Sequence, residues 1–337
     1  MPRATISDIA RAAGVSQTAV SFAFNSPSRL SPATVSRILA VANDLGYVPN
    51  PLSRGLVAGR TGMLGVIVPQ SLDTIYANPF FATLFRGIGS ICDEHNLGLL
   101  TLSPHNHSLE QSIARAPVDG FIIVGLNEQH HEVMPLRKRG IPFVIVDGDA
   151  ETAPSVNSED EISAYVSAAH LLKQGHREVM ILAFETPDRH LDNIFYGVGA
   201  RRTWGYRRAF AEYDLPWPES TFLPTIGSIE GGARRFAAAW DDGHRPTAVL
   251  AASDVIALGV LQAARQRGLH IPGDLEVIGY DDIPLAALAC PALSTVRQPI
   301  VEKGRLAADL LVAALNGEPG AEQLMLPSEL ILRETTR

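Results

Sequence analysis

The pattern of apolar and polar positions divides the chain into two regions with different periodicities. Before residue 61, apolar residues recur every three or four positions, which predicts short amphipathic helices. From residue 63 onward, short apolar runs alternate with segments of helical periodicity, which predicts parallel sheets with helices on both faces. The predicted strands cover residues 64–68, 97–102, 121–124, 143–146, 179–183, 249–252 and 277–279, and the predicted helices cover 81–95, 162–175, 203–213, 231–241 and 255–268.

Capping residues locate the N-terminal helices. Thr5 can cap a first helix and Ser16 a second, and Gly14 between them supplies the stop. Ser31 followed by Pro32 is an N-cap and a first-turn proline for a third helix. Two short helices separated by a tight turn, with a third sharing their apolar core, predict a helix-turn-helix.

The surface of the second predicted helix suits contact with DNA. A recognition helix reads base edges in the major groove from its N-terminal residues. Gln17 can pair bidentately with adenine, and Thr18 and Phe22 offer apolar contact to thymine methyl groups, although Phe22 could equally pack in the helical core with Phe24. The candidate base readers are Gln17, Thr18, Ser21 and Phe22, and the other candidate DNA contacts of this region, mostly suited to phosphates, are Thr5, Ser16, Asn25, Ser31, Thr34 and Tyr47.

Charge changes the picture by separating a basic head from an acidic body. Residues 1–60 carry six arginines and two aspartates, a net charge of +4, whereas the remaining residues carry 22 basic and 34 acidic side chains. Phosphate repels the acidic body, so contact with nucleic acid is expected only at the head. Charge alone leaves DNA binding open, because small helical domains are often mildly basic.

The motifs of the first 50 residues resemble those of the LacI family of bacterial transcriptional regulators. They are TISDIA at 5–10, AGVS at 13–16, Val20-Ser21, Asn25 and LGYVPN at 45–50. The resemblance covers almost the whole chain. It implies a helix-turn-helix domain at 1–48, a hinge helix at 49–60 and an α/β core of two doubly wound parallel-sheet lobes, similar to type I periplasmic binding proteins.

The hinge segment is short and unstable by composition. Asn50 and Pro51 can start a helix, but it has about two turns, fewer than an isolated helix needs. Composition alone therefore favours a plain linker. The resemblance implies instead that Asn50, Arg54 and Leu56 belong to a hinge helix that pairs with its dimer mate on DNA, with Leu56 as an apolar wedge in the minor groove.

The length of the core favours two lobes over one large sheet. The polar stretch 149–155, which contains a proline, suggests a boundary near residue 157, and Cys290-Pro291 ends the last helix of the second lobe. We therefore expect a first lobe of residues 61–157 plus a returning segment 293–325, and a second lobe of residues 158–292.

Polar residues at the ends of predicted strands are the candidate effector contacts. Open α/β sheets bind ligands at the C-terminal ends of their strands, which selects Asp147, Ser253, Asp254 and Asp281. The resemblance implies that Arg202 and Asp281 are the family's effector-binding arginine and aspartate, and that Phe80 is an aromatic of the first lobe. These groups suit a carbohydrate, although a purine or nucleoside would use the same chemistry. Helix capping by the aspartates and an inter-lobe ion pair of Arg202 are the structural alternatives.

No motif predicts an enzyme, a cofactor or a metal. The run Gly197-Val198-Gly199 lacks the third glycine of a dinucleotide loop, and neither a nucleophile elbow nor a phosphate loop is present. Two histidine pairs, His105 with His107 and His130 with His131, have no carboxylate or cysteine at a regular ligand spacing. We therefore expect no catalytic residue, no cofactor and no metal.

Cysteine and apolar content point to a cytoplasmic protein without a membrane anchor. Cys92 and Cys290 are far apart and are expected to be reduced, no apolar run has the length of a membrane span, and the N-terminus does not resemble a signal peptide. The predicted function is a ligand-responsive repressor that binds a pseudo-palindromic DNA operator as a homodimer, with a sugar-like effector in the inter-lobe cleft. The core should dimerise through both lobes without forming a tetramer, because leucine heptads are absent. The alternative is a cytoplasmic sugar-binding or sugar-processing protein whose N-terminal helices mediate association.

Overall fold

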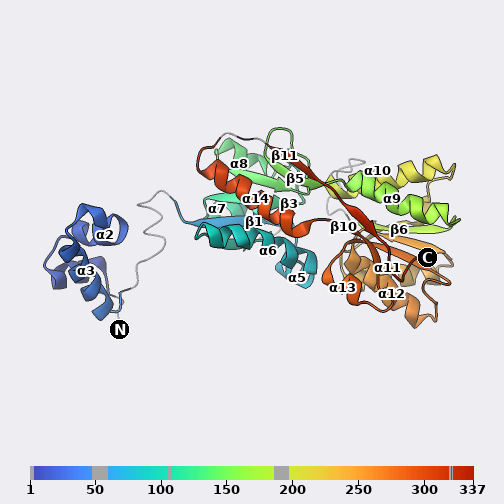
Figure 1. Cartoon of the computed structure of the whole chain (residues 1–337), viewed down its shortest axis with the longest axis horizontal. Helices are drawn as coiled ribbons and strands as arrows, with labels where there is room; N and C mark the ends of the chain where they lie inside the picture. Colours follow the sequence, from blue (N-terminus) through green and yellow to red (C-terminus); the bar gives the residue numbers. More distant parts are fainter. Residues whose placement is uncertain (1–3, 48–59, 105–107, 186–196, 319, 321) are drawn as a thin grey trace. The chain divides into compact units, whose positions relative to one another are not determined.

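The computed structural model describes residues 4–47, 60–104, 108–185, 197–318, 320 and 322–337, which form a helical head and a larger α/β core (Figure 1). The core contains two separate six-stranded sheets. The predicted fold class, a helix-turn-helix head followed by two parallel-sheet lobes, is confirmed.

Local capping chemistry defines the helices of the head. The Asp8 N–H donates to Thr5 Oγ1 at 3.3 Å while the Thr5 N–H donates to the Asp8 carboxylate at 3.0 Å, and Gly14 ends the first helix at a φ of 64°. Ser16 Oγ then accepts the Ala19 N–H at 3.1 Å and starts the second helix. The elements of the head are α1 (Ile6–Ala13), α2 (Gln17–Asn25), the 3-10 turn η1 (Pro27–Arg29) and α3 (Pro32–Asp44).

The head has an apolar core of its own. Ile9, Val20 and Ile38 are fully buried, and each comes from a different helix. The rings of Phe24 and Tyr47 pack against this core with their centroids 5.6 Å apart. The head therefore presents α2 on a small, self-contained scaffold.

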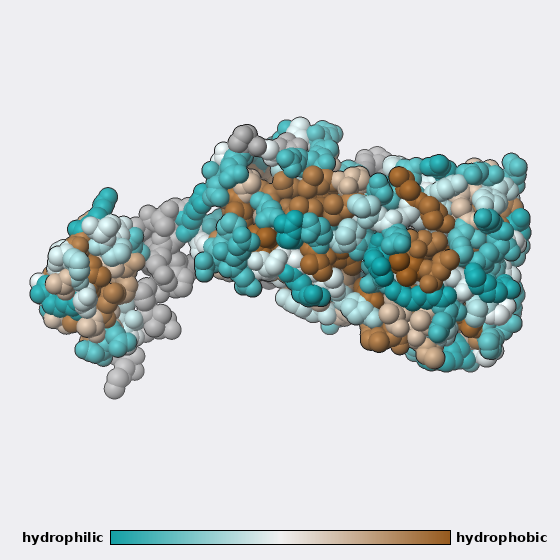
Figure 2. Space-filling model, in the orientation of Figure 1, coloured by the Kyte–Doolittle hydropathy of each residue, from teal (hydrophilic) through white to brown (hydrophobic). Residues whose placement is uncertain are grey.

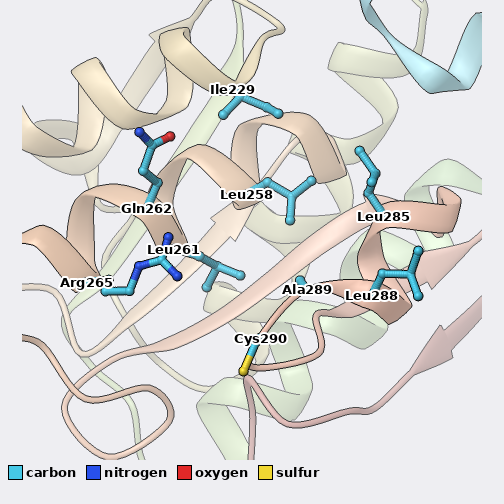
Figure 3. A pocket seen from close by; sticks show the side chains of 9 residues that line it. All are labelled: Ile229, Leu258, Leu261, Gln262, Arg265, Leu285, Leu288, Ala289 and Cys290. Atoms are coloured by element: carbon cyan, nitrogen blue, oxygen red, sulfur yellow. The ribbon is translucent and has the colours of Figure 1, made fainter.

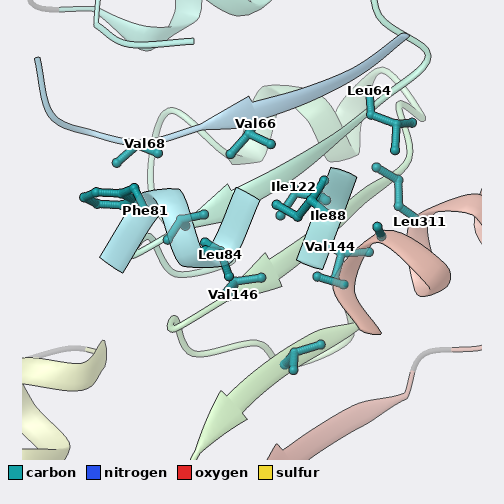
Figure 4. Packing of buried hydrophobic residues seen from close by; sticks show 14 of the residues in the cluster. Leu64, Val66, Val68, Phe81, Leu84, Ile88, Ile122, Val144, Val146 and Leu311 are labelled. Carbon is teal, nitrogen blue, oxygen red and sulfur yellow. The ribbon is translucent and has the colours of Figure 1, made fainter. Parts of the chain in front are cut away.

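The first sheet has the strand order β11-β5-β4-β3-β1-β2, and β3 pairs in parallel with both β1 and β4. Apolar side chains of β1, β3 and β4 point toward α6 and α14 (Figure 4). The elements before the first crossing to the other lobe are β1 (Met63–Ile67), α5 (Leu72–Ala77), α6 (Pro79–Glu94), β2 (Gly98–Leu102), α7 (Leu109–Arg115), β3 (Gly120–Val124), α8 (Met134–Lys138), β4 (Phe143–Val146) and β5 (Ser155–Ser158).

The second sheet has the order β12-β10-β9-β8-β6-β7 and is buried on both faces. Met180 belongs to the apolar cluster shared with α11 and α12, and the next residue, Ile181, to the cluster shared with α9 and α10. This explains the continuous apolar sequence of the central strands. The elements are α9 (Asp160–Lys173), β6 (Val179–Phe184), α10 (Gly197–Glu212), η2 (Glu219–Thr221), β7 (Phe222–Thr225), α11 (Ile229–Asp241), β8 (Ala248–Ala251), α12 (Asp254–Gln266), β9 (Glu276–Asp281) and α13 (Pro284–Leu288).

The C-terminal segment crosses between the lobes more often than predicted. We expected residues 293–325 to lie in the first lobe, but β10 pairs in parallel with β9 of the second sheet, with Ser294 opposite Ile278. The strand is short and its last residue, Arg297, is exposed, so its sequence lacks the apolar run of a central strand. The tail consists of β10 (Ser294–Arg297), α14 (Ile300–Leu315), β11 (Gln323–Leu326) and β12 (Glu329–Ile331), of which α14 and β11 join the first lobe.

Helices α6 and α14 approach each other to backbone contact. A Cβ atom on Gly87 would lie 1.9 Å from the Val301 carbonyl oxygen, and one on Gly304 would lie 2.3 Å from that of Leu84. Only glycine permits this approach at both positions. The contact fixes α14, and the polar residues that it carries, against the first lobe.

We predict that Gly87→Ala lowers the unfolding free energy of the core by about 1–3 kcal/mol, because the new methyl group overlaps the α14 backbone. The matched control is Gly89→Ala in the same helix, where a Cβ would meet no atom within 4 Å. That change should be neutral or stabilise by up to about 1 kcal/mol through helix propensity. Urea unfolding followed by circular dichroism measures both, and equal effects would contradict the proposed contact.

Candidate functional site

The start of α2 forms the candidate DNA-reading surface. Gln17 and Thr18 are exposed in its first turn, and Ser21 lies half-buried one turn later. Asn25 is exposed, and its Nδ2 donates to Ser21 Oγ at 3.3 Å. The amide of Gln17 and the hydroxyl of Thr18 are therefore exposed at the start of α2, where they can hydrogen-bond to DNA.

Phe22 lies at the side of this surface. Phe24, rather than Phe22, is among the side chains that pack against the head core. The ring of Phe22 is half-buried, and the guanidinium carbon of Arg29 lies 5.0 Å from its centroid. This cation–π contact leaves Phe22 on the surface of the head, which agrees with a DNA-contact assignment better than with core packing.

Four of the candidate phosphate contacts, Thr5, Ser16, Ser31 and Thr34, lie at helix N-termini, whereas Asn25 is the last residue of α2 and Tyr47 follows α3. The hydroxyls of Ser16 and Ser31 accept the N–H groups of Ala19 and Thr34, and Thr5 caps α1. Helix N-termini attract anions because their backbone N–H groups point outward. The predicted hinge contacts Asn50, Arg54 and Leu56 lie outside the described residues.

The core brings six polar side chains from both lobes together at the C-terminal ends of strands. Each is at most 6% exposed, so their charges are shielded from water. We call these six residues the inter-lobe polar cluster. They are Asp147 after β4, Asp160 at the start of α9, Arg202 in α10, Asp281 at the end of β9, Gln298 after β10 and Lys303 in α14.

An ion pair forms the second-lobe half of the cluster. Arg202 Nε donates to Asp160 Oδ1 at 3.0 Å, and Arg202 Nη1 donates to the Ala252 carbonyl at 2.5 Å. The guanidinium carbon lies 3.5 Å from the ring centroid of Tyr280, whose hydroxyl donates to Asp160 Oδ1 at 3.2 Å. Burial alone would raise the pKa of Asp160, but the positive charges of Arg202, Lys303 and Arg201 hold it below its ordinary value.

A relay of hydrogen bonds joins the first-lobe half to the second lobe. Lys303 Nζ donates to Asp147 Oδ1 at 2.6 Å and to Gln298 Oε1 at 2.6 Å. Gln298 Nε2 in turn donates to Asp281 Oδ1 at 2.6 Å. Burial raises the pKa of Asp281 well above its ordinary value.

Two residues of the cluster have strained backbones. Asp147 has a φ of 58° and Asp281 a φ of 123°, and Asp282 follows with a φ of 55°. Residues with a side chain rarely adopt these angles, and such strain concentrates at ligand-binding sites. The strain therefore supports a functional role for both strand ends.

Arg201 forms a second bridge between the lobes. Its Nη1 donates to Asp149 Oδ1 at 2.5 Å and its Nη2 to Asn157 Oδ1 at 3.1 Å, both in the first lobe. It also donates to Asp160 Oδ2 at 3.2 Å through Nη2. The inter-lobe ion pair considered for Arg202 is therefore made by its neighbour Arg201, whereas Arg202 pairs with Asp160 within the second lobe.

The other predicted effector residues have different surroundings. Asp254 accepts the Ile283 N–H at 2.9 Å and the Thr295 hydroxyl at 2.5 Å, so both carboxylate oxygens are used inside the second lobe, and burial raises its pKa to about 7. Ser253 Oγ is buried without a hydrogen-bond partner in the described part of the chain. Phe80 is half-buried against the first-lobe core, and its ring packs edge-on against that of Phe81, with the ring centroids 5.3 Å apart.

Sequence reasoning missed four residues of this region: Asp160, Arg201, Gln298 and Lys303. One signal could have found Lys303, which lies on the apolar face of its helix, three residues after Ile300 and four before Ala307. A lysine at such a position must have a buried partner. Asp160 and Gln298 lie in segments without a distinguishing pattern.

The histidine pairs are only partly described. His105 and His107 lie outside the described residues, whereas the rings of His130 and His131 are 4.4 Å apart. Glu132 brings a carboxylate within 4.8 Å of their nitrogen atoms, which ligand spacing did not predict, and it already accepts the Leu109 N–H at 2.7 Å. Among the described residues no helix is long and apolar enough to span a membrane.

Known proteins combine the same head and core. Residues 5–50 match the bacterial regulatory proteins of the lacI family, and residues 168–336 match a periplasmic binding protein-like domain. Catabolite control protein A of Priestia megaterium is 31% identical over 99% of this chain and 99% of its own length. The chain belongs to the LacI family. The HTH-type transcriptional regulator DegA of Bacillus subtilis (strain 168) is 32% identical over 99% of this chain and 98% of its own length.

A solved structure is similar to this chain over nearly its full length. The transcriptional regulator CelR in complex with cellobiose has a TM-score of 0.73 and 27% identity, and it covers 99% of this chain and 100% of its own. As a member of the LacI family, our chain is a DNA-binding transcriptional regulator and not an enzyme. The alternative in which the N-terminal helices merely mediate association is therefore wrong.

Glu128 holds the loop that follows β4 of this LacI-family core. Its Oε2 accepts the N–H groups of Glu151 and Thr152 at 2.7 Å each and that of Ala153 at 3.0 Å, and its Oε1 accepts the Thr152 hydroxyl at 2.6 Å. Burial alone would raise the pKa of Glu128, but these hydrogen bonds lower it to about 2. The carboxylate thereby positions the loop that carries Asp149.

We predict that Glu128→Gln lowers the unfolding free energy by about 1–3 kcal/mol at pH 7, because charged acceptors of buried N–H groups are lost. The folded pKa of about 2 is below the ordinary 4.5. The stabilisation is therefore complete above about pH 5 and is lost as the pH falls toward 2. We expect the difference in unfolding free energy between the wild type and this variant, measured with urea, to become smaller from pH 7 to pH 3. Glu110→Gln, at an exposed position, is the control. If the loss of unfolding free energy in Glu128→Gln did not change with pH, the low pKa of Glu128 would be contradicted.

Proposed function

We propose that this regulator is a cytoplasmic repressor that binds a pseudo-palindromic operator as a homodimer and responds to a sugar-like effector held between the lobes of its core. The observation that carries the proposal is the inter-lobe polar cluster, which links strand ends of both lobes in a chain that also carries a DNA-reading head. An effector that changes this cluster changes how the lobes are held. DNA affinity and effector affinity are then coupled by one free energy.

The head supports sequence-specific binding. We assign base contacts to Gln17, Thr18, Ser21 and Phe22, because the start of α2 is exposed and rests on a capped scaffold. A single head reads one half-site, so a pseudo-palindromic operator requires two chains. The hinge contacts Asn50, Arg54 and Leu56 complete this proposal by analogy with the family motif.

An apolar pocket of the second lobe supports the homodimer. It has a volume of about 280 Å³ and lies between α11, α12 and α13 (Figure 3). Leu288 and Leu285 at its edge are 78% and 41% exposed, and apolar residues gather on the surface at α13 (Figure 2). Apolar patches of this kind mark protein interfaces. We propose a second copy of this chain as the occupant, since two heads must be joined.

The polar cluster supports a sugar-like effector. Arg202, Asp147 and Asp281 offer donors and acceptors in one place, which suits the several hydroxyls of a sugar, and Phe80 supplies an aromatic face. A related regulator has been solved with cellobiose. Ser253 and Asp254 stay candidate contacts, with Asp254 acting through the loop that it binds.

We predict that Gln17→Ala weakens operator binding about 10- to 100-fold and relaxes base preference, because one bidentate base contact is lost. Footprinting over the protein's own promoter region defines the site, and mobility shifts at physiological salt measure affinity. Ser36→Ala, an exposed change in α3, is the control. Absence of any specific footprint would overturn the repressor proposal.

We predict that Asp281→Ala reduces effector affinity about 10- to 100-fold while operator binding persists, because a buried hydrogen-bonding group is removed. Asp281→Asn should retain most of the affinity, because an amide keeps the size of the side chain and offers both a hydrogen-bond acceptor and a donor. Calorimetry with sugars measures the effector affinity, and mobility shifts with operator DNA measure operator binding. An unchanged effector response in Asp281→Ala would contradict the site.

A further inference from the structure

The charges of the inter-lobe polar cluster and its neighbours cancel in pairs. Lys303 Nζ lies 2.6 Å from Asp147 Oδ1, and Arg202 Nε lies 3.0 Å from Asp160 Oδ1. Arg201, beside the cluster, pairs with Asp149. The partner of Asp281 is the neutral amide of Gln298 rather than a cation. Each of the three cations of the region therefore lies beside a carboxylate.

Lys303 is the most buried cation of this set. Its side chain is 0% exposed, and it lies on the face of α14 that packs against the first lobe. An ammonium group in such a place is strongly destabilising unless a carboxylate and further hydrogen bonds compensate it. Asp147 and Gln298 supply both, so Lys303 is held where it neutralises a strand-end carboxylate of the proposed effector site.

Building on the proposed function, we propose that Lys303 is a specificity-determining residue of the effector site: by neutralising Asp147 it makes the site select an uncharged polyol and reject anionic sugars. This inference deepens the proposed function and depends on it.

The chemistry of the cluster explains the selection. An uncharged hydroxyl both donates and accepts, so it can exchange with the hydrogen bonds of Gln298 while every ion pair stays intact. A phosphate or carboxylate accepts only. It would have to displace Asp147 from Lys303 or Asp160 from Arg202, so a buried carboxylate would lose a cationic partner, which costs more than the new pair returns.

The test uses the full-length protein and calorimetry with a fixed panel. The uncharged probes are ribose, glucose and cellobiose, and the anionic probes are ribose 5-phosphate, glucose 6-phosphate and glucuronate. We expect the best uncharged probe to bind at least 10-fold more tightly than any anion. In Lys303→Met its affinity should fall at least 10-fold, whereas glucosamine should gain affinity because its ammonium can pair with Asp147.

Two further variants separate charge balance from damage to the fold. Arg305→Met removes a cation two residues along α14 whose partners are the partly exposed Glu302 and Asp309, and its ligand selectivity should match the wild type. In the double variant Lys303→Met/Asp147→Asn both charges of the pair are removed. It should regain the preference for uncharged over cationic sugars, and it replaces the single variant if thermal melting shows that Lys303→Met does not fold.

Each outcome decides between the two claims. Tighter binding of an anionic probe, unchanged selectivity in folded Lys303→Met, or a double variant that prefers glucosamine to the uncharged probes overturns the role of Lys303 and leaves the effector-responsive repressor standing. Absence of binding by all uncharged and anionic probes, with operator binding intact, overturns the sugar effector and this inference together.

Discussion

Charged groups can lie in the joint between two lobes only if every one of them has a partner. An isolated buried ion is strongly unfavourable, so Arg202 needs Asp160, and Lys303 needs Asp147. Because these partners come from different segments, satisfying them fixes the relative positions of the strand ends and of α14. The same requirement makes the inter-lobe polar cluster sensitive to a ligand, since a ligand that replaces one hydrogen bond of the cluster changes the strength of the others.

The packing of the first lobe serves this joint. Gly87 and Gly304 allow α6 and α14 to touch through their backbones, which leaves little freedom for α14 to slide. Lys303 precedes Gly304, so its ammonium is placed by this helix contact. Glu128 acts in a similar way on the carboxylates, because it holds the loop that starts at Asp147, the ion-pair partner of Lys303, and that carries Asp149. The site is therefore positioned by contacts that no effector touches.

Local signals predicted the head and the strand ends well. Thr5, Ser16 and Ser31 cap helices through bonds to residues three positions away, so the sequence contains the whole interaction. Asp147 and Asp281 could be placed because parallel strands end at a common edge. Which group binds each carboxyl could not be predicted, since Lys303 lies 156 residues after Asp147.

The position of the short strand β10 could not be predicted from its sequence. Its four residues have no apolar run, and its place in the second sheet is determined by pairing with β9 and β12. The neighbourhood of Asp254 was also beyond prediction, because its partners Ile283 and Thr295 come from a loop and a strand of later sequence. Long-range pairing, rather than local propensity, decides both.

The three crossings between the lobes, after β5, β10 and β11, have a mechanical consequence. They touch one another: Ser158 Oγ donates to Gln298 Oε1 at 3.4 Å, and the Glu159 N–H donates to the Leu326 carbonyl at 3.0 Å. A joint made of one strand would allow the lobes to swivel freely. Three chain segments joined by hydrogen bonds resist twisting of one lobe against the other, because twisting has to break these bonds. Bending that keeps the three segments together leaves the bonds intact, so it requires less free energy than twisting does.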